Sequence, residues 1–386
     1  MSSCCFEQRG LMVCEMGFGG VWLVACLMAI LLCSCGAQGN ASVESAAQTQ
    51  RGVEVSLHGA TTTAGAEFSK PRRLIIDTDT GADDASAIIL AATCPDVQIE
   101  GVTVLTGNVN MEQSAKNALM ALQVAGCEAP VYKGSASTYD GENKVASSVF
   151  GADGMGDKNL VNPEEQAEEG DAIDFIINSV KAHPNEVEIL MLGPATNVAK
   201  AIDRDPETMS HVARIWSMGT AGLGPGNASP VAEFNVYADA HAYKVLLDSG
   251  IPVTVIGLDM CGDEAGWTSA QFEELAKANE AGEFVSESFG KFREFYATND
   301  AGESVMNCDA LATMCALYPD FVTETKACHG SCIVQQGETY AQVLFYQKGF
   351  TYGMVANDFT YDVTLVSGVK KQDFFKRYLE AIKTIP

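Results

Sequence analysis

The sequence predicts an α/β fold with an open, mixed and mainly parallel sheet flanked by helices. Short apolar stretches with the length of buried strands alternate with longer stretches of helical periodicity. The predicted strands cover residues 72–76, 97–106, 187–192, 251–259 and 360–366. The predicted helices cover residues 84–92, 111–126, 171–182, 308–318 and 372–384, with a further helical section at 269–300. Several strands end in polar or glycine-rich turns before a helix begins, which is typical of the ligand-binding edge of such a sheet.

Length and charge limit what the chain can bind. With 386 residues and 47% hydrophobic composition it can bury a large core, and one domain over residues 71–386 is expected. The formal net charge is -26 and the isoelectric point is near 4.4. A chain of this charge repels nucleic acid and other phosphorylated ligands, so a neutral or cationic small molecule is the expected partner.

The first 35 residues have the pattern of a signal peptide. Residues 17–32 form a nearly uncharged apolar run, and residues 32–36 (Leu-Cys-Ser-Cys-Gly) resemble the lipobox of bacterial lipoproteins. The resemblance implies cleavage before Cys35, lipidation of that cysteine, export, and anchoring to the outer face of the bacterial cell membrane. An uncleaved anchor would leave the domain on the same side. Residues 36–70 are rich in Ala, Ser, Thr and Gly and predict a flexible linker.

Four aspartates occur within eight residues where the first predicted strand meets the first predicted helix. They are Asp77, Asp79, Asp83 and Asp84, and no Lys or Arg lies between them. Because like charges this close repel one another, their ionised form requires a compensating positive charge, which a bound cation supplies. Ligand sets made of oxygen alone suit Ca²⁺ or Mg²⁺ better than zinc. The sequence therefore predicts a metal site at this turn.

The aspartate turn has three other interpretations. Asp is favoured in the first turn of a helix, but that preference accounts for only one or two of the aspartates. An EF-hand loop needs Gly where Ala82 stands and Glu where Ile88 stands, so its spacing fails. A phosphatase that forms an aspartyl phosphate also begins with a strand and Asp-x-Asp, and only later segments of the chain distinguish it.

Two segments resemble the nucleoside hydrolases, enzymes that cleave the N-glycosidic bond of ribonucleosides with the help of calcium. Residues 77–84 (Asp-Thr-Asp-Thr-Gly-Ala-Asp-Asp) are similar to the family signature Asp-x-Asp-x-Gly-x-Asp-Asp. Residues 226–235 (Gly-Asn-Ala-Ser-Pro-Val-Ala-Glu-Phe-Asn) match a second family segment almost residue for residue, and neither segment belongs to phosphatase chemistry. The resemblance implies the Rossmann-like nucleoside hydrolase fold and the inosine- and uridine-preferring type. It also implies hydrolysis of a small-molecule ribonucleoside to ribose and free base, and a homo-oligomer, either a dimer or a tetramer.

The same resemblance implies a metal site and a general base. Asp79, Asp84, Asp309 and the backbone carbonyl of Leu192 would bind Ca²⁺, with Mg²⁺ the less favoured ion, and Asp77 would support the cluster. The ion would lower the pKa of a water molecule, and Asp79 would act as the general base.

Substrate-binding residues follow from the resemblance as well. Asn227 and Glu233 would hold the side of the ribose with the 5′-hydroxyl, while Asp83 and Asn235 would hold the 2′,3′ diol. Asn108 stands where the family has an active-site asparagine. Amide and carboxylate groups match ribose hydroxyls, which both donate and accept hydrogen bonds.

Two positions depart from the family pattern. Cys308 stands before Asp309 where a histidine commonly protonates the leaving base, and Phe150 replaces the histidine of a glycine-rich loop. Cys308 is the candidate catalytic acid by position, although a thiol with a reference pKa of about 8.5 is a poor substitute for imidazole. These departures favour one alternative of another class, a membrane-anchored protein that binds a nucleoside or ribose without turnover.

The wall over the base is the least specified part of the predicted site. In the family the helical section at residues 269–300 forms part of it. Aromatic residues in and next to this section could stack on a base or belong to the core. They are Trp267, Phe289, Phe292, Phe295 and Tyr296.

Overall fold

The computed structural model describes residues 70–386, except residues 140, 142, 144, 159, 161, 300–303 and 354–357. These residues belong to one compact unit. The predicted signal peptide with Cys35, and the predicted linker up to residue 69, lie outside the described residues. In the described part of the chain, no helix has the length and apolar character that crossing a membrane requires.

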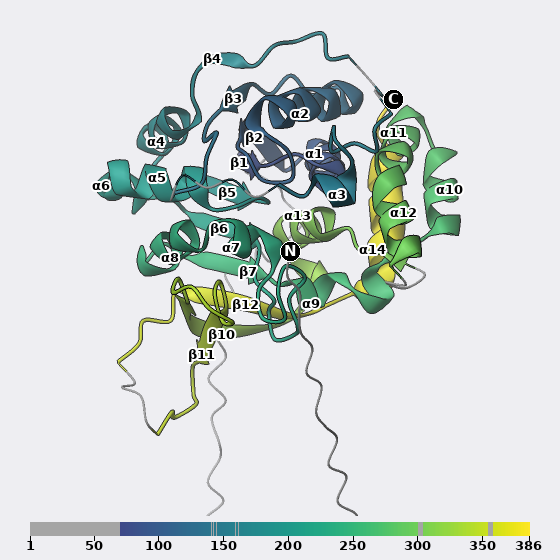
Figure 1. Cartoon of the computed structure of the whole chain (residues 1–386). Coiled ribbons are helices and arrows are strands. Elements are labelled where there is room, and N and C mark those ends of the chain that lie inside the picture. Colours follow the sequence, from purple (N-terminus) through teal and green to yellow (C-terminus); the bar gives the residue numbers. More distant parts are fainter. Residues whose placement is uncertain are drawn as a thin grey trace, which may run out of the picture. The chain divides into compact units, whose positions relative to one another are not determined.

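A ten-stranded sheet runs through this unit (Figure 1). Its strands are β1 (Arg72–Thr78), β2 (Val97–Val104), β3 (Val131–Lys133), β4 (Glu168–Asp171), β5 (Val187–Met191), β6 (Arg214–Met218), β7 (Val253–Ile256), β10 (Val322–Cys332), β11 (Val343–Gln347) and β12 (Val363–Val369). Their order is β11-β10-β12-β7-β6-β5-β1-β2-β3-β4, and β10 alone runs in the direction opposite to the other nine strands. The predicted mixed and mainly parallel sheet is therefore confirmed. A second sheet pairs β8 (Trp267–Thr268) with β9 (Ser304–Val305).

Helices cover both faces of the large sheet. They are α1 (Ala82–Ala92), α2 (Met111–Ala125), α3 (Ser147–Phe150), α4 (Ala172–Ala182), α5 (Thr196–Arg204), α6 (Pro206–Met209), α7 (Phe234–Ala238), α8 (Ala240–Asp248), α9 (Leu258–Cys261), α10 (Ser269–Ala276), α11 (Glu280–Ser288), α12 (Gly290–Thr298), α13 (Cys308–Leu317) and α14 (Phe374–Ile382). Side chains of β1 alternate between the faces: Leu74 and Ile76 join the core with α1, α2, α13 and α14, whereas Ile75 joins the core with α4, α5 and α8. Each of these fully buried side chains contributes roughly 1.5–3 kcal/mol.

The order in which the chain adds strands to the sheet reverses at β1. The chain continues from β1 to β2 on one side, while β5 and β6 lie on the other side. In open parallel sheets such a point opens a crevice at the carboxyl ends of the strands. The segments after β1, β2, β5 and β6 lead to this edge, and each of them carries predicted site residues.

Candidate active site

The turn between β1 and α1 is built around Asp84. Its Oδ1 accepts a hydrogen bond from Thr78 Oγ1 (2.6 Å), and its Oδ2 accepts from Gly81 N (2.8 Å) and Asn108 Nδ2 (2.9 Å). Gly81 is the N-cap of α1, so the Asp84 carboxylate closes the first turn of the helix. Capping therefore explains Asp84, but not the other aspartates of the turn.

Asp79 lies between two loops that approach it closely. Its Oδ2 accepts a hydrogen bond from the Asn108 backbone N–H (2.5 Å), whereas its Oδ1 is buried with no hydrogen-bond partner among the described residues. A methyl group at Gly107 would overlap this carboxylate, and one at Gly193 would lie 2.6 Å from Oδ1. Glycine after β2 and after β5 thus lets the backbone approach the carboxylate, which a larger residue would displace.

Asp83, Asp84 and Asp309 form a buried carboxylate cluster. One oxygen of each lies within 4.8 Å of the others, and Asp83 Oδ1 has no hydrogen-bond partner in the described part of the chain. Burial and the neighbouring carboxylates raise the pKa of Asp83 to about 8 and hold the pKa values of Asp79 and Asp309 well above their usual range. Converging anionic oxygens, one of them unpaired, fit a hard divalent cation. Asp79 stands outside this group of three, although its charge acts on Asp309.

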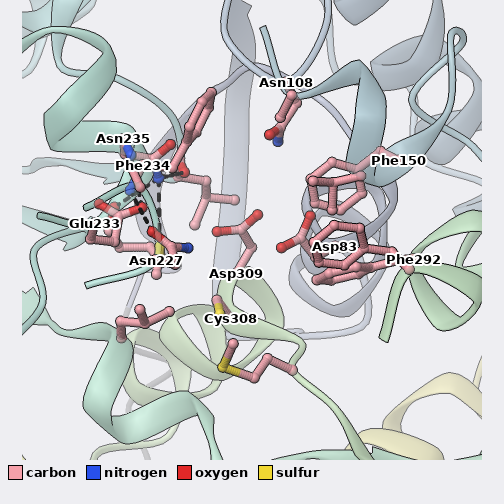
Figure 2. A pocket seen from close by; sticks show the side chains of 18 of the residues that line it. Asp83, Asn108, Phe150, Asn227, Glu233, Phe234, Asn235, Phe292, Cys308 and Asp309 are labelled. Carbon is pink, nitrogen blue, oxygen red and sulfur yellow. Dashed lines mark hydrogen bonds between the residues drawn. The ribbon is translucent and has the colours of Figure 1, made fainter. Parts of the chain in front are cut away.

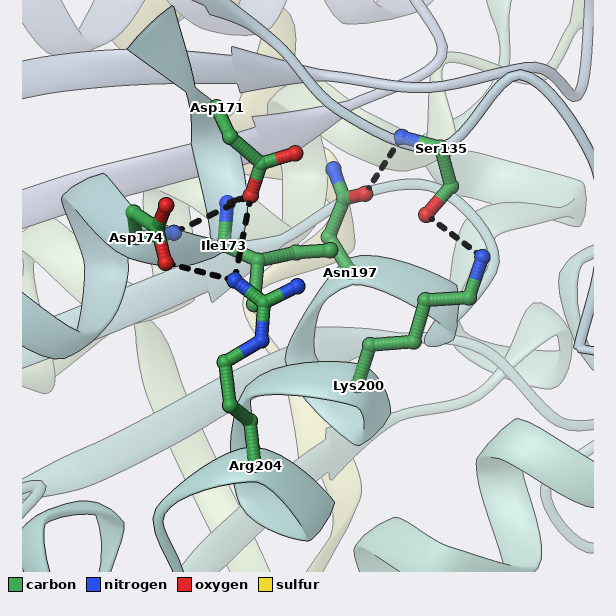
Figure 3. Close-up of polar contacts among 7 residues, drawn as sticks. All are labelled: Ser135, Asp171, Ile173, Asp174, Asn197, Lys200 and Arg204. Carbon is green, nitrogen blue, oxygen red and sulfur yellow. Dashed lines mark hydrogen bonds and ion pairs between the residues drawn. The ribbon is translucent and has the colours of Figure 1, made fainter.

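Asp77 is fully buried and is held by two neutral donors. Thr103 Oγ1 (2.6 Å) and Asn197 Nδ2 (2.9 Å) both donate to its Oδ1. Asn197 lies on α5, and its own Oδ1 accepts from the Ser135 backbone N–H (2.8 Å), while the Ser135 hydroxyl accepts from Lys200 Nζ (3.0 Å) (Figure 3). Burial raises the pKa of Asp77 to about 6. Asp77 therefore ties the end of β1 to α5.

A pocket of about 330 Å³ brings together most of the predicted site residues (Figure 2). Those that line it are Asp83, Asn108, Leu192, Asn227, Glu233, Asn235, Cys308 and Asp309. Asp77, Asp79 and Asp84 are not among its lining residues. Figure 2 shows the carboxylates of Asp83 and Asp309 between a polar side, which carries Asn227 and Glu233, and an aromatic side.

The polar side is anchored by Glu233, the N-cap of α7. Its Oε1 accepts from Asn235 N (2.8 Å), its Oε2 accepts from Thr220 N (3.1 Å), and burial raises its pKa to about 7. Asn235 Nδ2 donates to the backbone carbonyls of Leu192 (2.7 Å) and Met218 (3.2 Å). Because the amide nitrogen of Asn235 is used within the protein, its oxygen is the atom that can serve a ligand.

Asn227 and Asn108 each have one amide atom held by the protein. Asn227 Oδ1 accepts from the Phe234 backbone N–H (2.9 Å), and Asn108 Nδ2 donates to Asp84 Oδ2 (2.9 Å). The Asn227 nitrogen and the Asn108 oxygen can therefore face a ligand, one as a donor and one as an acceptor. This combination matches hydroxyl groups.

The opposite side of the pocket is apolar and aromatic. The ring centroids of Phe150 and Phe292 are 4.7 Å apart, and Phe292 packs edge-on against Tyr296 at 5.1 Å. Of the predicted wall residues, the pocket is lined by Phe292, Phe295 and Tyr296, whereas Trp267 and Phe289 are fully buried in the core. Further apolar lining residues lie on loops and element ends that give no periodic sequence signal. They are Ala146, Val149, Met218, Ala228, Phe234, Leu258 and Met306.

Cys308 begins α13 and lines the pocket next to Asp309. Its side chain hydrogen-bonds with Cys261, and this bond together with burial raises the pKa of the Cys308 thiol well above its usual range. No His, Lys or Arg is among the described residues that line the pocket. In the described lining, the position where a histidine is expected is therefore occupied by Cys308, whose thiol is a weak acid.

Several proteins with similar sequences or structures are named as nucleosidases or nucleoside hydrolases. The model of the family described as inosine-uridine preferring nucleoside hydrolase matches residues 74–376. A probable uridine nucleosidase of Oryza sativa is 35% identical over 277 residues, which cover 69% of this chain and 85% of the relative. A solved plant nucleoside hydrolase has a TM-score of 0.76 and 26% identity, with 81% of this chain and 99% of that chain covered. A solved purine-preferring ribonucleoside hydrolase from Gardnerella vaginalis has a TM-score of 0.75 and 30% identity at the same coverage, 81% and 99%.

The family match extends from β1 into α14. It therefore includes the aspartate turn, residues 227–235 and the start of α13, which together supply the lining of the pocket's polar side and its carboxylates. Both solved relatives align over nearly their whole length with this α/β fold. The chain belongs to the inosine-uridine preferring nucleoside hydrolase family and is an N-ribosyl hydrolase that acts on ribonucleosides.

Proposed function

We propose that the chain hydrolyses the N-glycosidic bond of ribonucleosides to ribose and free base with a bound Ca²⁺ and an aspartate general base. The observation that carries this proposal is the cluster of buried carboxylates beside a pocket with a polar and an aromatic side. Asp79, Asp84, Asp309 and the Leu192 carbonyl are the proposed ligands, with Asp77 in support. An all-oxygen donor set drawn from separate segments favours Ca²⁺, since Mg²⁺ demands a near-ideal octahedron. When bound, the cation would lower the pKa of a water molecule and so supply a nucleophile near neutral pH.

Asp79 is the proposed general base. One of its oxygens is held by the Asn108 backbone N–H, and the other is buried without a partner in the described residues, so this oxygen is free to take a proton. The carboxylates also favour the positive charge that develops on the sugar as the bond breaks. The proposed substrate contacts are Asp83 and Asn235 to the 2′,3′ diol, Asn227 and Glu233 to the 5′-hydroxyl, and Asn108 within the site.

The relatives do not share one base preference. One is named a uridine nucleosidase and another a purine-preferring hydrolase. Base choice therefore depends on the aromatic side of this chain's own pocket. Cys308, which lines the pocket, is the proposed catalytic residue for the departing base because of its position before Asp309.

Release of free base from inosine, uridine, adenosine and cytidine by the full-length protein, with Ca²⁺ and with a chelator, tests the proposal. Asp79→Asn is expected to lower kcat by about 10²–10⁴-fold, the range of general-base catalysis. Asp174→Asn is a matched control and should leave kcat unchanged. Asp174 is an exposed residue of α4 whose carboxylate forms an ion pair of 2.5 Å with Arg204 of α5 (Figure 3). Turnover that survives chelation or Asp79→Asn contradicts the mechanism. Binding of nucleosides without any cleavage would favour the anchored nucleoside-binding protein.

We further propose that the chain is exported and anchored to the outer face of the bacterial membrane through Cys35, and that it forms a dimer or tetramer. The support for the anchor is the apolar run and lipobox-like sequence of residues 17–36. Metabolic labelling with a radioactive fatty acid should mark the wild-type chain and not Cys35→Ser; label on both variants or on neither contradicts the anchor. Light scattering of the purified protein at the monomer mass would contradict the oligomer.

A further inference from the structure

Asp259 is not among the described residues that line the pocket, but its neighbour Leu258 is. Asp259 belongs to α9, the short helix that follows β7. Its Oδ2 accepts a hydrogen bond from the Leu223 backbone N–H (3.0 Å), and its backbone carbonyl accepts one from Lys371 Nζ (3.0 Å). Lys371 thus fixes the backbone of Asp259, while the Asp259 carboxylate holds a loop from another part of the chain, residues 219–226.

Glycines make room for this carboxylate. A methyl group at Gly222 would overlap Asp259 Oδ1, and one at Gly257 would lie 2.6 Å from the same oxygen. Gly222 also has a φ of +67°, in the left-handed region that favours glycine. Glycine at these two positions therefore leaves the space in which the Asp259 carboxylate lies against the loop.

The loop held by Asp259 leads directly to the polar side of the pocket, because it joins β6 to Asn227. Thr220, its second residue, donates its backbone N–H to Glu233 Oε2 (3.1 Å). The Thr220 carbonyl accepts a hydrogen bond from the Leu258 backbone N–H (3.0 Å). The start of the loop is therefore tied both to Glu233 and to α9.

Asn227 depends on this loop more than Glu233 does. Glu233 is held within α7, where its Oε1 accepts from Asn235 N (2.8 Å). Asn227 instead follows a stretch rich in glycine, Gly-Thr-Ala-Gly-Leu-Gly-Pro-Gly at residues 219–226. Because glycine has the most backbone freedom to lose, holding such a loop in one conformation requires contacts from outside it. Asp259 supplies one of these contacts.

We propose that Asp259 is a positioning residue of the site for the ribose 5′-hydroxyl, where its carboxylate fixes the loop so that Asn227 meets this hydroxyl. The inference rests on the proposed function, which assigns Asn227 and Glu233 to the 5′-hydroxyl. A hydrogen-bonding group that is already held in place binds its partner without a further cost of ordering. Loss of the anchor should therefore weaken recognition of the 5′ end of the substrate.

Substrates without the 5′-hydroxyl measure this recognition. With the full-length protein and Ca²⁺, kcat/KM is compared between uridine and 5′-deoxyuridine and between inosine and 5′-deoxyinosine. In the wild type, two hydrogen bonds should favour the hydroxylated member by about tenfold or more. Asp259→Ala is expected to lower this ratio at least about threefold, the effect of one weakened hydrogen bond. Asp259→Asn should keep the ratio, because its side-chain oxygen can still accept from Leu223.

Further variants separate positioning from a general loss of stability. Asp171 also holds backbone N–H groups, among them that of Ile173 (3.0 Å) at the start of α4, so Asp171→Ala should destabilise the protein but leave the ratio unchanged (Figure 3). Gly222→Ala would displace the Asp259 carboxylate and should lower the ratio as Asp259→Ala does. Leu223→Ala should not, because this side chain is 55% exposed and the backbone N–H remains.

The outcomes distinguish the positioning role from the hydrolysis itself. A change of less than threefold in Asp259→Ala, or in Gly222→Ala where Asp259→Ala does not fold, overturns the role of Asp259 and leaves the hydrolase standing. An equal fall in Asp171→Ala also overturns it, since lost stability would then be the cause. A wild-type ratio near one overturns the assignment of Asn227 and Glu233 to the 5′-hydroxyl and this inference with it. Cleavage of neither uridine nor inosine overturns the proposed function as well.

Discussion

Asn235 donates a hydrogen bond of 2.7 Å from its side-chain nitrogen to the backbone carbonyl oxygen of Leu192. This contact joins α7, on the polar side of the pocket, to the residue that follows β5. The same nitrogen donates to the Met218 carbonyl at the end of β6 (3.2 Å). One side chain thus couples the proposed diol site to the carbonyl proposed for the cation.

Replacing Asn235 by alanine is expected to lower kcat/KM for uridine by about 10²-fold or more, because the substrate loses a contact and two strand ends lose their shared donor. The affinity for Ca²⁺ should fall as well, since the Leu192 carbonyl is no longer oriented. Steady-state kinetics and a Ca²⁺ titration measure the two effects. Asn235→Asp keeps the oxygen but places a carboxylate against two carbonyls, so it should not restore activity. Unchanged Ca²⁺ affinity in both variants would contradict the coupling.

The carboxyl group of Glu233 makes the stability of the metal-free protein depend on pH. Burial raises its pKa from the usual 4.5 to about 7, so the folded state holds this proton more tightly than the unfolded chain does. The corresponding stabilisation is fully present below about pH 4.5 and is lost as the pH rises through 7. A shift of this size corresponds to a loss of about 2–3 kcal/mol between pH 5 and pH 8.

Urea unfolding of the metal-free protein at pH 5 and pH 8 measures this loss. Glu233→Gln cannot titrate, so its free energy of unfolding should change less between the two pH values by about 2–3 kcal/mol. Glu207→Gln, at an exposed position of α6, is the matched control and should behave as the wild type does. The same pH dependence in Glu233→Gln and in the wild type would show that other groups are responsible.

Some features of the site follow from short stretches of sequence, and others do not. The aspartate turn could be predicted because it holds four acidic residues within eight positions, more than the preference of Asp for the first turn of a helix accounts for. The spacing of residues along the sequence does not predict that Asp83 and Asp84 group with Asp309. This group forms only because α13, from a distant part of the chain, packs against α1. A resemblance to a family can indicate such a partner, but local periodicity cannot.

The aromatic residues of the helical section illustrate the same limit. Phe292 and Trp267 are both aromatic residues in or next to this section, and the sequence does not show which of them faces a ligand. In the structure, Phe292 lines the pocket and Trp267 is fully buried. The hairpin of β10 and β11 is also unexpected from sequence, because β10 carries charged residues such as Glu324 and Lys326 where a continuous apolar run would predict a strand. In each case tertiary packing decides what the local pattern leaves open.

Calcium is expected to stabilise the protein, and more so at pH 8 than at pH 5.5. The carboxylates of Asp83, Asp84 and Asp309 repel one another without a cation, and protons compete with the cation because burial raises the pKa values of these groups, that of Asp83 to about 8. At 100 times its dissociation constant a ligand adds about 2.7 kcal/mol, which should raise the Tm by several degrees. Thermal unfolding with Ca²⁺, Mg²⁺ and chelator measures the effect. Asp309→Asn should lose most of it, and an equal response to Mg²⁺ would contradict the preference for Ca²⁺.

Trp267 is expected to matter for stability and not for substrate binding. Its side chain is fully buried, and its ring lies 4.7 Å from that of Tyr378 and 5.4 Å from that of Phe374. Trp267→Ala should cost about 3–5 kcal/mol, the cost of a large cavity. Trp267→Phe should cost only about 1–2 kcal/mol, because it leaves a smaller cavity and removes an indole N–H that has no partner among the described residues.

Urea unfolding measures the stability of each variant. KM for uridine, measured under conditions in which each variant is folded, shows whether substrate binding changes as well. Because Trp267 does not line the pocket, KM should stay within about twofold of the wild-type value in Trp267→Phe, whereas Phe292→Leu should raise it, since base stacking on an aromatic ring is worth about 1–3 kcal/mol. A large rise in KM for Trp267→Phe at unchanged stability would place the indole against the base. That result would require the helical section around α12 to rearrange when a nucleoside binds.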